Sequence, residues 1–268
     1  MSAVTTTAAN DAPSTAEDLL ARLLYRDALV LIIDKPAGLA VHPGPKGGPN
    51  LEDLLDGLRF GLPRRPELAH RLDRDTSGCL VLGRHRRALR RLGRLFAAGR
   101  VDKTYWAVVE GAPPEAEGRI DLPLGRRNRA RGWWMKVDPD GLPSITDYRV
   151  RGGTKDRTWL ELRPLTGRTH QLRVHLAALG CPVLGDPIYG PARATEREGP
   201  PLHLHARAIA LPLYPNRPPI NATAPPPPHM LTALTACGLA EPFEPIVTRA
   251  GAERVPDPAR NDHPKQAP

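Results

Sequence analysis

Hydrophobic residues recur along the chain in short runs, some continuous and some alternating with polar positions. Runs of this length that are rich in Val, Ile, Leu and aromatic residues are typical of β-strands. Most of them end at or beside glycine or proline, which commonly mark the end of a strand. The pattern therefore predicts strands over 28–36, 78–83, 103–111, 144–152, 158–167 and 205–213.

Other segments place their apolar residues at the three-to-four spacing of an amphipathic helix. This spacing predicts helices over 16–25, 51–62, 84–101 and 169–180. The third of these helices has leucines and Phe96 on one side and arginines on the other. The fourth ends at Gly180, a residue type that often caps a helix C-terminus.

The predicted strands and helices are interspersed, but they do not follow a regular βαβ rhythm. That order favours an α+β fold with a mixed, mostly antiparallel central sheet and flanking helices. Residues 1–17 are rich in Thr, Ala and Ser and are predicted to be disordered, whereas 18–240 are predicted to form one domain. Proline is frequent from about residue 215, so we expect little regular structure there, and 241–268 are expected to form a flexible, Pro-rich tail.

The charge of the chain bears on its partners. Its 268 residues are 40% hydrophobic, which is enough for a sizeable core. A formal net charge of +9 points to a polyanionic partner, with nucleic acid as the first candidate. A genome rich in G and C would also enrich arginine, so the charge alone does not decide. The absence of G-x-G-x-x-G and of a P-loop motif argues against nucleotide cofactors.

The cysteines and the N-terminal sequence indicate a cellular compartment. Cys79, Cys181 and Cys237 lie far apart, which argues against a zinc ribbon or a disulfide framework and favours a reducing compartment. The N-terminal residues lack the basic and apolar regions of a secretory signal, and no run of 18 apolar residues is present. We therefore expect a cytoplasmic protein that does not span a membrane.

Residues 70–78 read HRLDRDTSG and place Asp73 and Asp75 in a stretch rich in arginine. An EF-hand calcium loop starting at Asp73 needs glutamate at its twelfth position, where the chain has Arg84, so that interpretation is rejected. A magnesium-dependent phosphatase with Asp73 as nucleophile fits the spacing, but its strand should precede the loop, and here the strand follows. It remains an alternative. For Asp75 we keep the simpler interpretation of a polar residue in a turn.

Four further segments accompany this stretch. They are LIIDKPAGLAVHPG (31–44), DKTYWAVVEG (102–111), LTGRTHQLRVHLAALGCPVLGDPIYG (165–190) and LHAR (204–207). Together with HRLDRDTSG they resemble the sequence blocks of the RluA family of RNA pseudouridine synthases, over about residues 23–213. The resemblance implies isomerisation of specific uridines to pseudouridine in a stem-loop of tRNA, rRNA or both, without a cofactor or a metal.

The resemblance also assigns roles to individual residues. It implies that Asp73 is the catalytic aspartate, that Arg173 pairs with it, and that Tyr105 stacks on the uracil and serves in proton removal. Arg71 is implied to occupy the place that the flipped base leaves in the RNA. The residues expected to bind RNA or substrate around the pocket are His70, Arg168, His170 and Gln171.

Two questions remain open in the sequence. A non-catalytic RNA-binding protein on the same scaffold is a second alternative, although the joint presence of Asp73, Tyr105 and Arg173 argues against it. The arginines of 84–101 either line a face that binds the RNA backbone or form a solvated helix surface. In 126–136, paired tryptophans amid arginines are expected to place one ring on RNA. We expect the protein to bind RNA. We also expect it to be a monomer without a protein partner.

Overall fold

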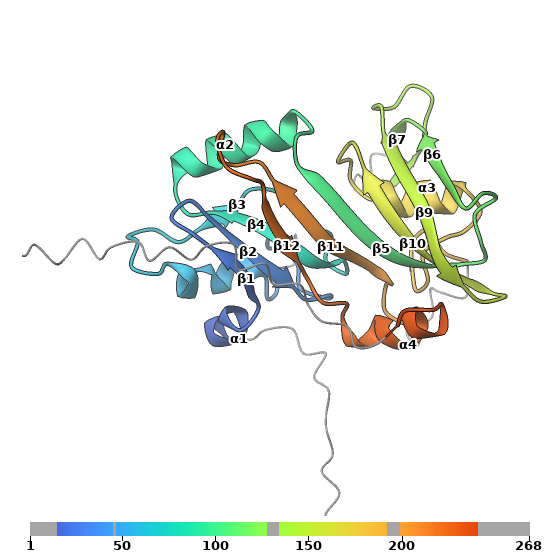
Figure 1. The fold of residues 1–268 in the computed structure, drawn as a ribbon, viewed down its shortest axis with the longest axis horizontal. Helices are drawn as coiled ribbons and strands as arrows, with labels where there is room; N and C mark the ends of the chain where they lie inside the picture. The colour runs from blue at the N-terminus through green and yellow to red at the C-terminus, as the bar shows by residue number, and fades with distance from the viewer. Residues whose placement is uncertain (1–14, 45–46, 128–133, 192–198, 241–268) are drawn as a thin grey trace, which may run out of the picture.

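The computed structural model describes residues 15–44, 47–127, 134–191 and 199–240. A ten-stranded sheet runs through this part of the chain (Figure 1). Its main path follows the order β1 (Leu23–Arg26), β2 (Val30–Lys35), β4 (Ser77–Gly83), β11 (Leu204–Leu211), β5 (Asp102–Glu110), β10 (Arg157–Pro164), β9 (Ile145–Gly153) and β6 (Glu117–Asp121). The short strands β3 (Glu67–Leu68) and β12 (Ile220–Thr223) pair with β4 and β11. Among the pairings of the named strands only that of β4 with β11 is parallel, which confirms the predicted α+β class with a mixed, mostly antiparallel sheet.

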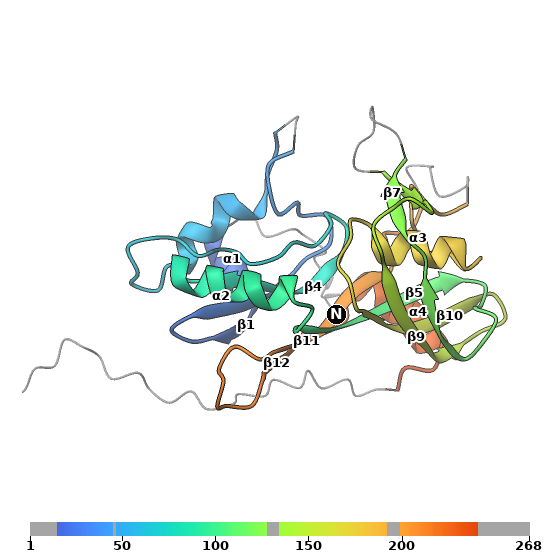
Figure 2. The same cartoon turned by 90° about the horizontal axis from the view of Figure 1, so that it is seen from above.

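Successive side chains of a strand point to opposite faces, so each face of the sheet needs its own cover. On the half that holds β2 and β4, α2 (Arg86–Ala97) covers one face, and η1 (Leu51–Leu58) and α1 (Ala16–Leu20) cover the other. On the half that holds β5 and β10, α3 (Gln171–Ala178) and α4 (Pro228–Ala236) pack on opposite faces. Figure 2 shows the two halves side by side, with α2 on one and α3 on the other. None of the described helices is long and apolar enough to cross a membrane.

The two N-terminal helix predictions need correction. Of the helix expected over 16–25, only α1 forms, because Leu23–Arg26 pair with β2 as strand β1. Leucine spacing suits either structure there, and the available partner strand decides, since so short a helix gains little from its own propensity. The segment expected to be helical over 51–62 is a 3-10 helix that ends at Leu58.

The expectation of little regular structure beyond residue 215 is wrong. Strand β12 pairs with β11 over Ile220–Thr223, and α4 follows it. Pro228 stands in the first turn of α4, where a helix makes no use of the missing N–H, so the proline run does not prevent the helix. Buried side chains of α4 then pack against β5 and β10.

Several predictions concern residues outside the described ranges. They are the disorder of 1–14, the tail over 241–268, and most of the basic stretch within 126–136. The last part of the segment predicted to be disordered is described: Thr15 caps α1, which begins at Ala16. Between β5 and β9 the structure also has strand β6 and the hairpin of β7 (Leu124–Arg126) with β8 (Met135–Val137).

The parallel pairing of β4 with β11 fixes the end of the HRLDRDTSG stretch. Gly78 has a φ of +106°, and an added Cβ would overlap the backbone of Ala206, so only glycine fits there. Beside it, Ser77 Oγ lies 2.8 Å from Nδ1 of His205. The turn that carries Asp73 therefore leads into a tightly held junction at the centre of the sheet.

Candidate active site

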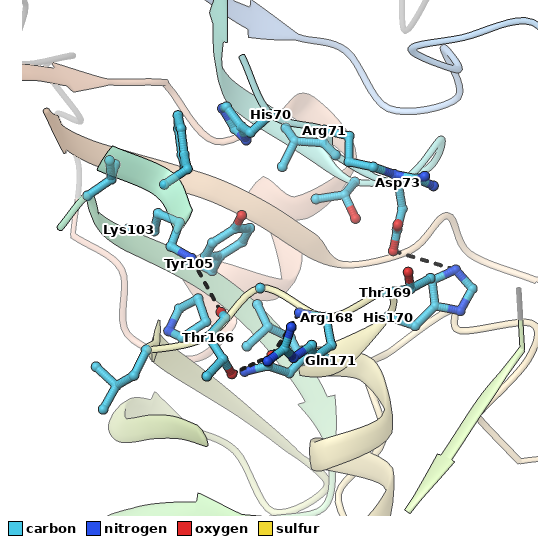
Figure 3. Close-up of a pocket in the computed structure, with 18 of the residues that line it drawn as sticks. His70, Arg71, Asp73, Lys103, Tyr105, Thr166, Arg168, Thr169, His170 and Gln171 are labelled. Carbon is cyan, nitrogen blue, oxygen red and sulfur yellow. Dashed lines mark hydrogen bonds and ion pairs between the residues drawn. The ribbon is translucent and has the colours of Figure 1, made fainter. Parts of the chain in front are cut away.

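A pocket of about 640 Å³ lies where the two halves of the sheet meet (Figure 3). Its walls come from the turn before β4, the C-terminal end of α2, the start of β5 and the loop that leads into α3. The volume falls within the range of pockets that bind small organic ligands. The residues predicted for the site all line it: His70, Arg71, Asp73, Tyr105, Arg168, His170, Gln171 and Arg173.

Asp73 stands in the turn before β4, where its carbonyl accepts a hydrogen bond from the backbone N–H of Thr76 at 3.2 Å. Its side chain is 21% exposed. The Oδ2 atom lies 3.8 Å from Nη1 of Arg173 and 3.7 Å from Nε2 of His170. The carboxylate thus faces a guanidinium but keeps its oxygens open to the pocket.

Arg173 is held by a second carboxylate, that of Asp186. Its Nε and Nη2 donate to the Asp186 oxygens at 2.7 and 2.6 Å. Burial alone would lower the pKa of Arg173, but the bonds and charge of Asp186, with the charge of Asp73, keep it above its usual value. Asp186 also accepts backbone N–H bonds from Ile188 and Tyr189. Arg173 therefore stays a fixed, charged group at the base of the site.

His170 links Asp73 to the other side of the pocket. It has a φ of +51°, uncommon for a non-glycine residue, and it precedes α3. Its Nδ1 lies 2.8 Å from the hydroxyl of Tyr189, which also accepts a bond from the backbone N–H of Met135. Burial lowers the pKa of His170 and outweighs the opposing charge of Asp73. When Tyr189 donates to Nδ1, the remaining ring proton is on Nε2, which faces Asp73.

Tyr105 projects from β5 into the pocket (Figure 3). Its ring packs against two hydrophobic clusters, one in each half of the molecule. Burial raises the pKa of its hydroxyl, and the negative charge of Asp73 adds to this effect. The phenol therefore keeps its proton at neutral pH, which fits a stacking platform for a base better than a resting general base.

Lys35, at the end of β2, anchors the turn that carries Asp73. It is 0% exposed, and its ammonium donates to the carbonyls of Pro36, Leu39 and Arg74 at 2.7, 2.9 and 2.9 Å. Burial lowers the pKa of this ammonium to about 7, against the opposing effect of nearby aspartates. Three donors thus meet three acceptors, and one of these acceptors belongs to the residue after Asp73.

Two of the predicted binding residues are engaged within the protein. The amide of Gln171 accepts from Thr166 Oγ1 and from the backbone N–H of Arg168, and it donates to Ile145 O and Thr146 Oγ1. With both its donors and its acceptor oxygen occupied, Gln171 holds the loop before α3 in place. His70 likewise accepts the N–H of Val81 at 3.0 Å and stacks on the ring of Phe96.

The remaining cations of the pocket differ in exposure. Arg71 and Arg168 are exposed, and Arg168 donates to the carbonyl of Pro143 at 3.3 Å. Lys103 is half-buried, and its ammonium donates to the carbonyl of Thr166 at 3.3 Å. Burial lowers the pKa of Lys103, and burial together with the charge of Lys103 lowers that of His70 to about 3. His70 is therefore neutral, and the exposed arginines carry the charge of the rim.

Sequence reasoning missed the supporting residues Lys35, Asp186 and Tyr189. All three lie inside the segments that carry the family resemblance. The sequence around each of them, however, does not indicate which residues it contacts in the fold. The segment LGDPIYG (184–190) contains both Asp186 and Tyr189. In the fold, the single carboxylate of that segment neutralises Arg173.

The phosphatase interpretation of Asp73 is not favoured by this geometry. The nucleophile of such a site follows an apolar strand, whereas Asp73 precedes β4 and follows the two-residue strand β3. The charged neighbour of Asp73 is a guanidinium, and the nearby carboxylate of Asp186 is fully used by Arg173 and backbone N–H groups. The arrangement suits a carboxylate that acts on an uncharged base or sugar held in the pocket.

Comparison with known proteins gives the same class of protein. The model of a family described as RNA pseudouridylate synthase matches residues 29–178. An uncharacterized RNA pseudouridine synthase of Zymomonas mobilis is 45% identical over 209 residues, covering 77% of this chain and 94% of the relative. The ribosomal large subunit pseudouridine synthase D of Xanthomonas campestris is 40% identical over 237 residues, covering 82% of this chain and 70% of the relative.

A solved structure supports the likeness of the fold. The human RNA pseudouridylate synthase domain containing 4 superposes with a TM-score of 0.72 at 29% identity, over 85% of this chain and 97% of that one. The chain belongs to the RNA pseudouridylate synthase family, and it is an isomerase that acts on RNA. The resemblance found in the sequence is thereby confirmed.

Proposed function

We propose that this chain isomerises a uridine in a stem-loop of large-subunit ribosomal RNA, with Asp73 as its catalytic carboxylate. One observation carries the assignment to Asp73. Asp73 is an accessible carboxylate in a nucleotide-sized pocket, and its Oδ2 lies 3.8 Å from the buried guanidinium of Arg173, which Asp186 already neutralises. The class of RNA is supported by the names of relatives, which include ribosomal large subunit pseudouridine synthases of Xanthomonas campestris and Pseudomonas aeruginosa.

The reaction needs no net gain or loss of atoms. The N1–C1′ bond of uridine breaks, a C5–C1′ bond forms, and the proton of C5 is replaced by one on N1. Asp73 acts on the sugar or base carbon while the uracil is detached. Arg173 holds Asp73 in place through its charge, and the packed ring of Tyr105 gives the detached uracil a surface to stack on.

The target nucleotide has to leave the RNA stack before it can reach this pocket. Unstacking costs a few kcal/mol, and a side chain that fills the gap offsets part of this cost. Arg71 is exposed two residues before Asp73 and is our candidate for that role. Arg168 and His170 line the opposite side of the pocket and are proposed to contact the nucleotide. For His70 and Gln171 we propose a positioning role, because their polar atoms are bonded within the protein.

The proposal also covers organisation and location. We propose that 18–240 act as one catalytic domain, since β12 and α4 extend the same sheet and core that hold the pocket. We further propose a monomer that works in the cytoplasm, where ribosomal RNA is made and folded. Transfer RNA is the other substrate expected from the sequence, and the experiment below therefore also maps pseudouridine in transfer RNA.

The test maps pseudouridine in total RNA from a strain that lacks the gene and from the same strain carrying the wild-type gene or Asp73→Asn. We expect one or a few sites in large-subunit ribosomal RNA to be lost on deletion and restored by wild type alone. Full restoration by Asp73→Asn would remove Asp73 from the chemistry. Loss of sites in transfer RNA only would replace the proposed substrate.

A further inference from the structure

The outer side of α2 carries a continuous stripe of arginines. At 100° per residue they span an arc of about 140°, and the buried side chains of α2 lie on the remaining surface. Four of the five are exposed and one is half-buried. The arginines of this face, here called the α2 arginine face, are Arg86, Arg87, Arg90, Arg91 and Arg94.

These arginines have no acidic partner among the described residues, unlike several exposed arginines elsewhere. On the half that holds β6, β9 and β10, three exposed arginines each pair with a carboxylate at 2.7 to 3.0 Å. The pairs are Arg119 with Asp147, Arg149 with Glu117 and Arg163 with Glu161. The α2 arginine face is therefore a concentrated positive charge that nothing in the described fold neutralises.

This arrangement works against the stability of the helix itself. Like charges four residues apart repel on a helix, and the face contains three such pairs: 86 with 90, 87 with 91, and 90 with 94. The first turn of α2 has no acidic residue, and its two arginines lie at the positive end of the helix dipole. A solvated helix surface would be more stable with mixed charges, so an anionic ligand is the simplest compensation.

The position of the helix suggests which anion this is. The C-terminal end of α2 and the turn after it, from Phe96 to Gly99, form part of the pocket wall. From Arg86 to Arg94 the face extends about 12 Å along the helix axis. That length spans a few phosphates of one nucleic acid strand. Figure 2 shows α2 running toward the half of the molecule that holds α3. Since the end of this helix borders the pocket, a strand whose flipped nucleotide occupies the pocket would pass α2 next.

We propose that the α2 arginine face binds the phosphate backbone of the RNA strand next to the target uridine. This inference rests on the proposed function, because the pocket at the end of α2 is taken as the site of that nucleotide. The contacts are electrostatic and independent of base sequence, so they position the RNA while the pocket selects the base. The face thus supplies affinity and orientation, not chemistry.

The experiment compares two triple variants that remove the same charge. Arg86→Gln, Arg90→Gln and Arg94→Gln change the α2 arginine face. Arg119→Gln, Arg149→Gln and Arg163→Gln form the matched control, on the paired arginines of the other half. The probe is an unmodified transcript of the large-subunit ribosomal RNA of the same organism. Binding is measured between about 0.05 and 0.3 M salt, and pseudouridine formation is measured on the same RNA.

The α2 variant is expected to lower affinity by on the order of a hundredfold near 0.1 M salt and to reduce the slope of log K against log salt by two to three. At saturating RNA its kcat should stay within about twofold of wild type, because no group of the pocket is changed. The control variant should keep most of the wild-type slope. Circular dichroism of all three proteins tests that they are folded.

The outcomes separate this inference from the proposed function. If wild type forms pseudouridine and both triple variants show the same affinity and slope, the role of the α2 arginine face is refuted while the function stands. If wild type forms none in this RNA, the proposed substrate fails whatever the variants do. If the α2 variant loses binding to vesicles of anionic lipid but keeps its RNA affinity, the face binds membranes instead.

Discussion

Arg173 donates to Asp186 at 2.7 and 2.6 Å but lies 3.8 Å from Asp73. The two carboxylates thus share one guanidinium unequally. The side chain of Asp186 is 0% exposed, whereas that of Asp73 is 21% exposed. Asp186 takes the role of counterion for the buried cation, and the oxygens of Asp73 remain available to a nucleotide. A carboxylate locked in both strong bonds would have little freedom to react.

Replacing Asp186 by asparagine should therefore affect both stability and catalysis. Removing one member of a buried ion pair leaves an uncompensated charge, which typically costs about 3–5 kcal/mol. The guanidinium of Arg173 then has Asp73 as its remaining anionic neighbour and is expected to move onto it. We expect kcat to fall at least about tenfold with little change in KM. Urea unfolding and steady-state kinetics on the same preparation measure the two effects.

A double variant distinguishes positioning from folding. Arg173→Met with Asp186→Leu removes both charges, so its unfolding free energy should lie closer to wild type than that of Asp186→Asn. Its activity should nevertheless stay low, because Asp73 has lost its guanidinium. Recovery of activity together with stability would show that the pair serves the fold alone.

Lys35→Met tests the anchor of the catalytic turn. Methionine fills similar space but leaves three buried carbonyls without their donor, among them that of Arg74. Each unsatisfied carbonyl costs about 1–3 kcal/mol, although relaxation and water reduce the sum. We expect a clear drop in melting temperature, and a loss of kcat even at temperatures where circular dichroism shows a folded protein. A variant that is less stable but fully active would contradict a link between Lys35 and the placement of Asp73.

The sequence predicted the parts of the fold whose signal is local. The strand at 78–83 and the helix at 84–101 carry long, regular patterns, and β4 and α2 form there. Strands β1 and β12 have four residues each, so their existence depends on neighbours that the pattern does not reveal. Helix α4 was missed because its proline run conceals a helix start.

Contacts between residues far apart in the sequence also limited what could be predicted of the site. Asp73 and Arg173 are 100 positions apart, and only the resemblance to a family connected them before the fold placed them 3.8 Å apart. The contact of Arg173 with Asp186 could not be predicted, because an Arg and an Asp in sequence do not indicate a shared pocket. Gln171 was expected to offer donors to RNA or substrate at the rim of the pocket, yet its amide donates to Ile145 O and Thr146 Oγ1 within the protein.

Acid should destabilise the protein through its buried histidines. Burial lowers the pKa of His205 to about 3 and that of His203 to about 4, against about 6.5 in the unfolded chain. Between these values the unfolded state binds more protons, so stability is full above pH 6.5 and falls as the pH drops toward 4. Each histidine contributes at most about 1.4 kcal/mol per pH unit.

Unfolding free energies between pH 7.5 and 5 measure this slope, in a range above most carboxylate titrations. His205→Gln should lower stability at pH 7, because Nδ1 and Nε2 contact Ser77 Oγ and the carbonyl of Ala224. The same variant should have a shallower pH dependence than wild type, since one titrating group is gone. An unchanged slope would mean that His205 does not titrate with folding.

Replacing glycine by alanine should have opposite effects on stability at two positions, Gly78 in β4 and Gly93 in α2. Gly93 is exposed in the middle of α2, and an added Cβ meets no atom within 4 Å. Gly93→Ala should stabilise the protein by about 0.5–1 kcal/mol, because alanine restricts the unfolded chain and favours the helix. Gly78→Ala forces a left-handed backbone on alanine and overlaps Ala206, so we expect a loss of at least about 1–3 kcal/mol. Thermal unfolding compares both with wild type, and a Gly93→Ala protein that melts lower would contradict the placement of that residue on an open helix surface.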